Sequence, residues 1–159
     1  MAATLVLTGL LGGPACTQSG PEPPKHRLFL VFFTGGGGAV PARFDPDLRE
    51  AACYMAPGAA VRIRGYADRT GAPDDNLRLS ELRATNVANA IGRYGVSCDR
   101  LEDRKGLGEE NGPNQSGNGP YSRRVEVYVA GTLPTGAALA ACMARPAPTP
   151  VPSPCIPPR

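Results

Sequence analysis

The chain has 159 residues and a formal net charge of +3, and its 20 glycines and 18 prolines make up about a quarter of its length. Seven of the prolines lie between Pro146 and Pro158, so the middle of the chain has the composition of one domain with a hydrophobic core. This excludes a multidomain enzyme, a collagen-like repeat and a fully disordered chain. The charges are interspersed and Trp is absent, which argues against a nucleic-acid partner.

Residues 1–16 are apolar and mostly small, and a polar stretch that contains proline follows them. An apolar run of about ten residues is typical of a signal peptide and is too short to span a membrane. Its end resembles a bacterial lipobox, in which small residues precede a cysteine that becomes diacylated, here Cys16. We expect lipid on Cys16, while ordinary cleavage near Ala15 and an uncleaved helix stay open. Residues 17–26 are then a linker.

The first half of the predicted domain contains two strands and one helix. Residues 27–33 form an apolar, aromatic run that ends before four consecutive glycines, which predicts a buried strand entering a loop. Residues 45–55 predict a helix, with Asp45 as its N-cap and Pro46 in its first turn. Residues 60–65 alternate apolar side chains with arginines, which predicts a strand in a sheet covered on one side.

The second half contains the longest helical pattern. It covers residues 74–94, directly after Pro73, and Gly95 ends it. Residues 100–106 and 124–130 predict two further strands, of which the second has the clearer alternation. The resulting order, β-α-β-α-β-β, predicts an α+β fold with two helices packed on one face of a mixed four-stranded sheet.

The chain returns to small residues and prolines after this domain. A proline-rich segment with so few apolar groups cannot build a core of its own. We therefore expect the domain to span residues 27–132 and residues 133–159 to form a disordered tail.

The five cysteines become an even number if Cys16 carries lipid, as expected in an oxidising compartment. We favour one disulfide within the domain and one within the tail, while other pairings and free thiols stay open. These two bonds would be Cys53–Cys98 and Cys142–Cys155. No CxxC motif is present, and the only histidine, His26, lies in the linker. This argues against a zinc site and against a Cys–His nucleophile, and no cofactor is predicted.

An arginine interrupts the apolar side of the long helix. Arg83 falls between Leu79 and Val87 on the helical wheel, and a charge in that position needs a partner. The partner is either a loop of the protein or an anionic ligand at the end of the sheet. The preceding loop carries Asp68, and an Asp and an Arg on adjacent elements suit an amino-acid head group.

Three stretches make a longer pattern, namely GYADRTGAPDDNLRLSELRATNVANAIGRYGV, RLEDRKGLGEENGP and SRRVEVYV. Over about residues 29–129 the chain resembles the OmpA-like peptidoglycan-binding domain. The resemblance implies that Asp68 and Arg83 bind the diaminopimelate of the peptidoglycan stem peptide. It also implies that three further residues complete the polar rim, namely Thr70, Asn76 and Arg124, the last from the family's Arg-Arg pair, here Arg123-Arg124.

The sequence departs from the family pattern at two places: Ala67 replaces a threonine, and residues 35–38 are all glycine where the family is often polar. No Gly-Lys-Ser/Thr follows these glycines, which argues against a phosphate-binding loop.

The resemblance implies a non-catalytic module that binds peptidoglycan. It would lie in the periplasm and be tethered to the outer membrane if Cys16 is acylated. Two alternatives stay open. An enzyme acting on peptidoglycan would lack a histidine in the domain for acid–base chemistry. A purely structural member would use Asp68 and Arg83 as an internal ion pair.

Overall fold

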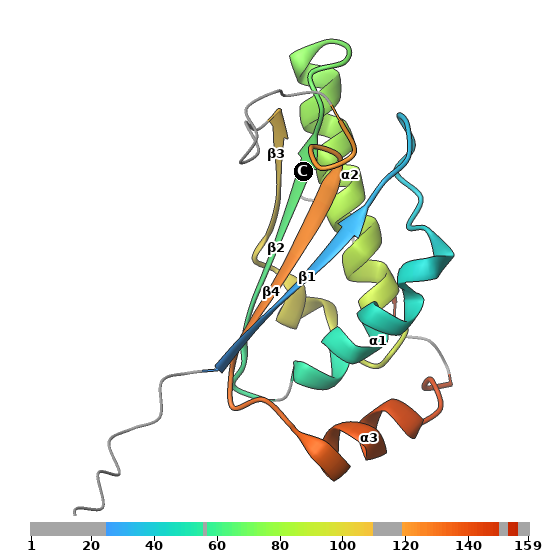
Figure 1. Cartoon of the computed structure of the whole chain (residues 1–159), viewed down its shortest axis with the longest axis vertical. Helices are drawn as coiled ribbons and strands as arrows, with labels where there is room; N and C mark the ends of the chain where they lie inside the picture. Colours follow the sequence, from blue (N-terminus) through green and yellow to red (C-terminus); the bar gives the residue numbers. More distant parts are fainter. Residues whose placement is uncertain (1–24, 56, 110–118, 150–152, 156–159) are drawn as a thin grey trace, which may run out of the picture.

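A mixed four-stranded sheet carries two helices on one face, and a third helix lies beneath the first (Figure 1). The structure is a computed structural model, and it describes residues 25–55, 57–109, 119–149 and 153–155. The expected signal segment, Cys16 and the linker up to residue 24 lie outside the described residues.

The strand order is β1-β4-β2-β3. Strand β4 pairs antiparallel with both β1 and β2, and β2 pairs parallel with β3. The predicted mixed sheet is therefore confirmed, with the last strand at its centre. The strands are β1 (Lys25–Phe32), β2 (Ala60–Ala67), β3 (Arg104–Glu109) and β4 (Arg124–Gly131).

Helices α1 (Asp45–Tyr54) and α2 (Pro73–Gly92) match the predicted pair within two residues at each end. A short 3-10 helix, η1 (Ala42–Phe44), runs directly into α1, so Phe44 occupies the N-cap position predicted for Asp45. The Asp45 carboxylate instead accepts hydrogen bonds from Tyr94 and Arg93 near the end of α2.

Strands β1 and β3 differ most from the prediction. Strand β1 begins at Lys25, so the last two residues of the expected linker belong to the sheet, where His26 stacks on Tyr128. Residues 98–101 form a second 3-10 helix, η2 (Cys98–Leu101), which buries Leu101, and β3 follows it. The alternation in this stretch is weak because Leu101 is the one buried residue of the turn and Cys98 is only partly buried against the core.

The core fills the space between the sheet and the helices. Its β4 contribution is the predicted alternating set of Val125, Val127 and Val129, all of them fully buried. Helix α2 lies directly on the strand backbones because β2 and β3 have glycines beneath it. A Cβ on Gly65 would lie 2.1 Å from the Ser80 carbonyl oxygen, and one on Gly106 would lie 2.3 Å from the Glu81 nitrogen.

The segment after the sheet corrects two predictions. Residues expected to be disordered form helix α3 (Gly136–Ala144), which packs on α1. The favoured disulfide pairing is also wrong, because the bonds join the domain to this segment as Cys53–Cys142 and Cys98–Cys155. Helix α3 brings Cys142 to Cys53 on α1, and the chain then returns to η2, where Cys155 is buried. Two cross-links to the domain order a segment that has no core of its own.

None of the described helices combines the length and the apolar character needed to cross a membrane.

Replacing Gly65 by alanine tests the close contact between α2 and β2. The new Cβ would collide with the Ser80 backbone, which cannot rotate away. We expect Gly65→Ala to lower the free energy of unfolding by about 2–3 kcal/mol, measured by urea unfolding followed by circular dichroism. Gly92→Ala is the control, since a Cβ there meets open space. Equal unfolding midpoints for the two variants would contradict this packing.

Candidate functional site

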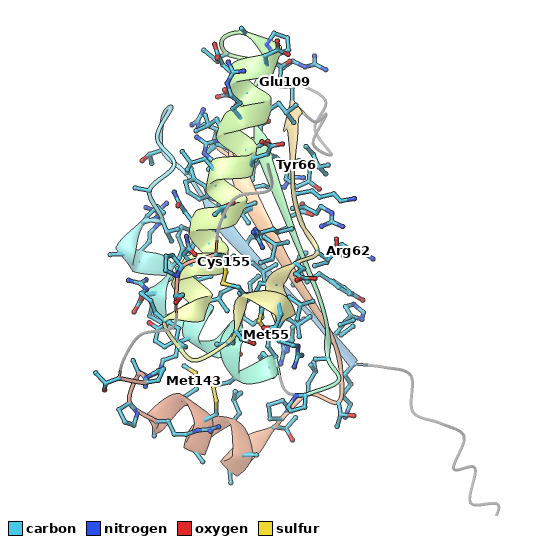
Figure 2. The ribbon with its side chains drawn as sticks, turned by 180° about the vertical axis from the view of Figure 1, so that it is seen from behind. Met55, Arg62, Tyr66, Glu109, Met143 and Cys155 are labelled. Carbon is cyan, nitrogen blue, oxygen red and sulfur yellow. A yellow bond between two sulfur atoms is a disulfide. The ribbon has the colours of Figure 1, made fainter. Side chains whose placement is uncertain are left out.

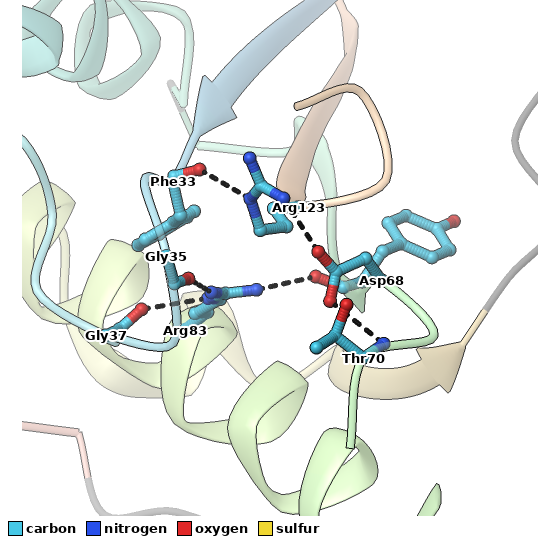
Figure 3. A network of polar contacts seen from close by, with 8 residues as sticks. Phe33, Gly35, Gly37, Asp68, Thr70, Arg83 and Arg123 are labelled. Carbon is cyan, nitrogen blue, oxygen red and sulfur yellow. Dashed lines mark hydrogen bonds and ion pairs between the residues drawn. The ribbon is translucent and has the colours of Figure 1, made fainter. Parts of the chain in front are cut away.

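Four segments converge where β2 ends and α2 approaches the sheet (Figure 3). Asp68 follows β2 directly, Arg83 comes from α2, and Arg123 precedes β4. The fourth segment is the glycine loop, residues 35–38, which follows β1. The predicted site therefore lies at one end of the sheet, built from turns that rigid elements hold in place.

The Arg83 side chain lies fully buried beneath the glycine loop, with an exposed fraction of 0%. Its Nη2 donates a hydrogen bond to the Gly35 carbonyl at 2.7 Å, and its Nε donates to the Gly37 carbonyl at 3.1 Å. Its Nη1 donates to the Tyr66 carbonyl at 3.3 Å. The guanidinium also lies 4.9 Å from the centre of the Phe33 ring, in cation–π geometry. The partner that the sequence required for this charge is thus a set of backbone carbonyls.

The charges around Arg83 act on its pKa in opposite directions. Burial lowers the pKa of the guanidinium, because desolvation disfavours its charged form. The carboxylate of Asp68 raises this pKa in turn, and the positive charge of Arg123 lowers it again. Arg83 therefore contributes a buried positive charge that depends on Asp68 for electrostatic compensation.

Asp68 forms its direct ion pair with Arg123. The Arg123 Nη1 donates to Asp68 Oδ2 at 2.7 Å, and the Thr70 backbone nitrogen donates to Asp68 Oδ1 at 3.3 Å. Arg123 also donates from Nε to the Phe33 carbonyl at 3.3 Å. The two side chains keep 14% (Asp68) and 24% (Arg123) of their surface exposed. Unlike Arg83, this pair is therefore partly accessible from solvent.

The site holds three of the five predicted residues, Asp68, Thr70 and Arg83 (Figure 3). Asn76 is buried elsewhere, where its Nδ2 donates to Glu109 Oε1 at 2.7 Å and ties the start of α2 to the end of β3.

Arg124 points away from the helices. Arg124 lies on the same face of β4 as Glu126, and its Nε donates a hydrogen bond to Glu126 Oε1 at 2.7 Å. Its guanidinium also stacks on Tyr66, 4.1 Å from the centre of the ring. The other face of β4 carries Val125 and its buried partners. Arg123, which precedes the strand, is the arginine that reaches Asp68. The alternation in β4 contained this signal, because residues on the face of Val125 and on the face of Arg124 cannot share a site.

The glycine loop contacts two further residues of α2, Asn86 and Leu82, in addition to Arg83. The Gly38 carbonyl accepts a hydrogen bond from Asn86 Nδ2 at 2.9 Å, and a Cβ on Gly38 would lie 2.8 Å from Leu82 Cδ2. Gly35 adopts a φ of +65°, which favours glycine. The loop therefore uses glycine where its backbone turns and where it approaches the helix closely.

The sequence model of the OmpA family matches residues 32–125 of the chain. The chain belongs to the OmpA family. The match contains Asp68, Arg83 and Arg123, whereas α3 and Cys155 lie beyond it.

Individual relatives agree with this assignment. The chain is 42% identical over 74 residues to the probable lipoprotein YiaD of Escherichia coli, covering 45% of this chain and 33% of the relative. It is 36% identical over 105 residues to the peptidoglycan-binding protein ArfA of Mycobacterium bovis, covering 63% of this chain and 32% of the relative. The chain thus spans about a third of the length of these relatives.

A solved structure supports the fold. The peptidoglycan-associated lipoprotein from Burkholderia pseudomallei superimposes with a TM-score of 0.57 at 25% sequence identity. The superposition covers 63% of this chain and 88% of the lipoprotein.

The part of the chain that the structure describes contains no group of three His, Cys, Asp or Glu side chains that could hold a metal ion. The polar groups at the candidate site are instead a carboxylate, two guanidiniums and backbone carbonyls.

Replacing Arg83 by methionine tests its role in holding the loop. Methionine retains much of the apolar stem but leaves the carbonyls without their donors. We expect the melting temperature of Arg83→Met to fall by about 8 °C or more, measured by circular dichroism. Arg78→Met, on an exposed position of the same helix, is the control and should change the melting temperature little. If both variants have the same melting temperature, Arg83 does not organise this end of the sheet.

Proposed function

We propose that the chain is a non-catalytic module that binds peptidoglycan through the diaminopimelate of the stem peptide. The observation that carries this proposal is the partly exposed ion pair of Asp68 and Arg123 at the end of the sheet. Membership of the OmpA family and the name of the relative ArfA support peptidoglycan as the ligand.

The chemistry of the ion pair suits the free end of diaminopimelate, which carries an ammonium and a carboxylate on one carbon. The ammonium would donate to the Asp68 carboxylate, and the Arg123 guanidinium would donate to the ligand carboxylate. The two side chains already lie 2.7 Å apart, so little ordering is needed on binding. The Thr70 hydroxyl would lie at the exposed rim.

Arg83 has a supporting role in this proposal. Its hydrogen bonds to Gly35 and Gly37 occupy the guanidinium, so direct contact with a ligand carboxylate would require the glycine loop to move. We infer that Arg83 positions the loop behind the site and adds positive charge beneath it. Asn76 supports the site from further away by fixing the start of α2. Arg124 supports β2 and β4 from the other face of the sheet.

The proposed location is the periplasm, with attachment to the outer membrane through lipid on Cys16. Two disulfides fit an oxidising compartment. The relative YiaD is named a probable lipoprotein, which supports an anchored form.

A second candidate is a structural member of the family that makes protein contacts and does not bind peptidoglycan. The burial of Arg83 and its hydrogen bonds to three backbone carbonyls favour this alternative. The partly exposed Asp68–Arg123 pair favours binding, because a ligand can reach both charges from solvent.

Binding to purified sacculi separates the two candidates. We expect Asp68→Asn and Arg123→Gln each to weaken sedimentation with sacculi by about tenfold or more, since each removes a charged hydrogen bond to the ligand. Arg78→Gln is the matched control, because it removes an exposed arginine outside the site and should bind like the wild type. If Asp68→Asn and Arg123→Gln fold normally and bind as well as this control, the assigned site is wrong.

A further inference from the structure

A cleft of about 600 Å³ lies at the other end of the domain from the Asp68–Arg123 pair. It opens between α1, the turn after α2, and the segment that contains α3. Figure 2 shows this end of the molecule around Met55 and Met143, far from Tyr66 and Glu109 at the end that holds the ion pair. The cleft is large enough for a small organic molecule.

One wall of the cleft lies outside the region that matches the OmpA family. Cys142, Arg145 and Pro148 form this wall, and they follow residue 125, where the match ends. The disulfide to Cys53 anchors the wall to α1, and the Cys98–Cys155 disulfide anchors the chain beyond it. The cleft therefore depends on the segment that the two disulfides attach to the domain.

The charge of the lining has one sign. Arg49 comes from α1, Arg100 from η2 and Arg145 from the residue after α3, and no described lining residue is acidic. Arg49 is held in place, because its guanidinium lies 5.6 Å from the centre of the Tyr94 ring and donates a hydrogen bond to the Arg145 carbonyl. Three guanidiniums from three separate segments thus lie around one opening.

Two carboxylates near the cleft, Asp45 and Asp99, accept hydrogen bonds from neighbouring residues. Asp45 accepts hydrogen bonds from Tyr94 and Arg93. Asp99 has a lowered pKa because Ser97 donates a hydrogen bond to it, with a smaller contribution from the charge of Arg100. Asp99 thus remains ionised and is the protein's own counter-charge for Arg100, whereas no described acidic residue lines the cleft beside Arg49 and Arg145.

The remaining lining is apolar. Met55 and Val96 contribute from the core, and the Cys53–Cys142 disulfide adds an apolar surface between α1 and α3. A simple inorganic anion would leave this surface exposed to water, whereas an uncharged apolar molecule would not use the positive charge of Arg49 and Arg145.

We propose that this cleft binds an organic anion that carries an apolar group, with a carboxylate or a phosphate as the charged part. The charged part lies beside the guanidiniums of Arg49 and Arg145, and the apolar part covers Met55, Val96 and the disulfide. This site is separate from the peptidoglycan site, so either one can be lost without the other.

Fluorescent probes of matched shape test the proposal on the full chain. The anionic probe is 1-anilinonaphthalene-8-sulfonate, and its uncharged counterpart is N-phenyl-1-naphthylamine. We expect the folded protein to bind the anionic probe at least about tenfold more tightly than the uncharged one. Added salt should weaken the binding of the anionic probe and leave that of the uncharged probe unchanged.

Two variants locate the binding. Arg145→Gln keeps the backbone carbonyl that Arg49 contacts and should lower the affinity for the anionic probe several-fold. The double variant Arg49→Gln with Arg145→Gln should lower this affinity by at least about tenfold. Arg62→Gln with Arg78→Gln is the control, since it removes the same charge from exposed positions elsewhere. This control should bind the anionic probe within about twofold of the wild type.

Competition identifies the charged part of the ligand. Dodecanoate and dodecyl phosphate should displace the anionic probe, and whichever does so at lower concentration indicates a carboxylate or a phosphate ligand. Inorganic phosphate should not displace it. The proposal is overturned if the folded protein does not bind the anionic probe, if it binds both probes equally, or if the cleft variants bind like the control.

Discussion

The buried guanidinium of Arg83 is the constraint on which this end of the molecule depends. A charge with no exposed surface would be destabilising by several kcal/mol if its donors lacked partners. The helix can bury Arg83 because carbonyls from two other segments come close enough to accept its hydrogen bonds. These carbonyls belong to β2 and to the loop after β1, so one side chain of α2 fixes where both segments end.

The glycines have a defined place in this arrangement. Gly65 and Gly106 let α2 approach the strands, which brings Arg83 within reach of the Tyr66 carbonyl. Gly35 supplies the turn that directs its carbonyl toward Arg83. Because Arg83 donates to the carbonyls of Gly35, Gly37 and Tyr66, Asp68 forms its ion pair with Arg123 instead. The partly exposed ion pair that we assign to ligand binding thus follows from the burial of the neighbouring arginine.

Local pattern was enough to predict the fold, because the apolar period of each strand and helix is contained in a few residues. The same period marked Arg83 as anomalous. It could not identify the carbonyls of Gly35 and Gly37 as partners, since backbone groups have no signature in the sequence. The family resemblance indicates Arg124 as a site residue, but the alternation in β4 separates Arg124 from the site, and Arg123 is the arginine that contacts Asp68.

The segment after the sheet was the least predictable part. The apolar residues of α3 are mostly alanines with no amphipathic period, so nothing local indicated its contact with α1. Its order depends on disulfides that link Cys142 and Cys155 to residues 89 and 57 positions away in the sequence. Disulfide pairings over such separations cannot be chosen from the spacing of the cysteines. The cleft beside these disulfides could not be predicted from the sequence for the same reason.

The central claim is that the pair of Asp68 and Arg123 recognises an ammonium and a carboxylate on the same ligand carbon. Calorimetric titration tests it most directly, with a stem peptide that contains diaminopimelate and the same peptide with lysine in its place, which lacks that carboxylate. We predict that the diaminopimelate peptide binds at least about tenfold more tightly. Equal affinity for the two peptides, or no binding of either by the folded protein, would contradict the account.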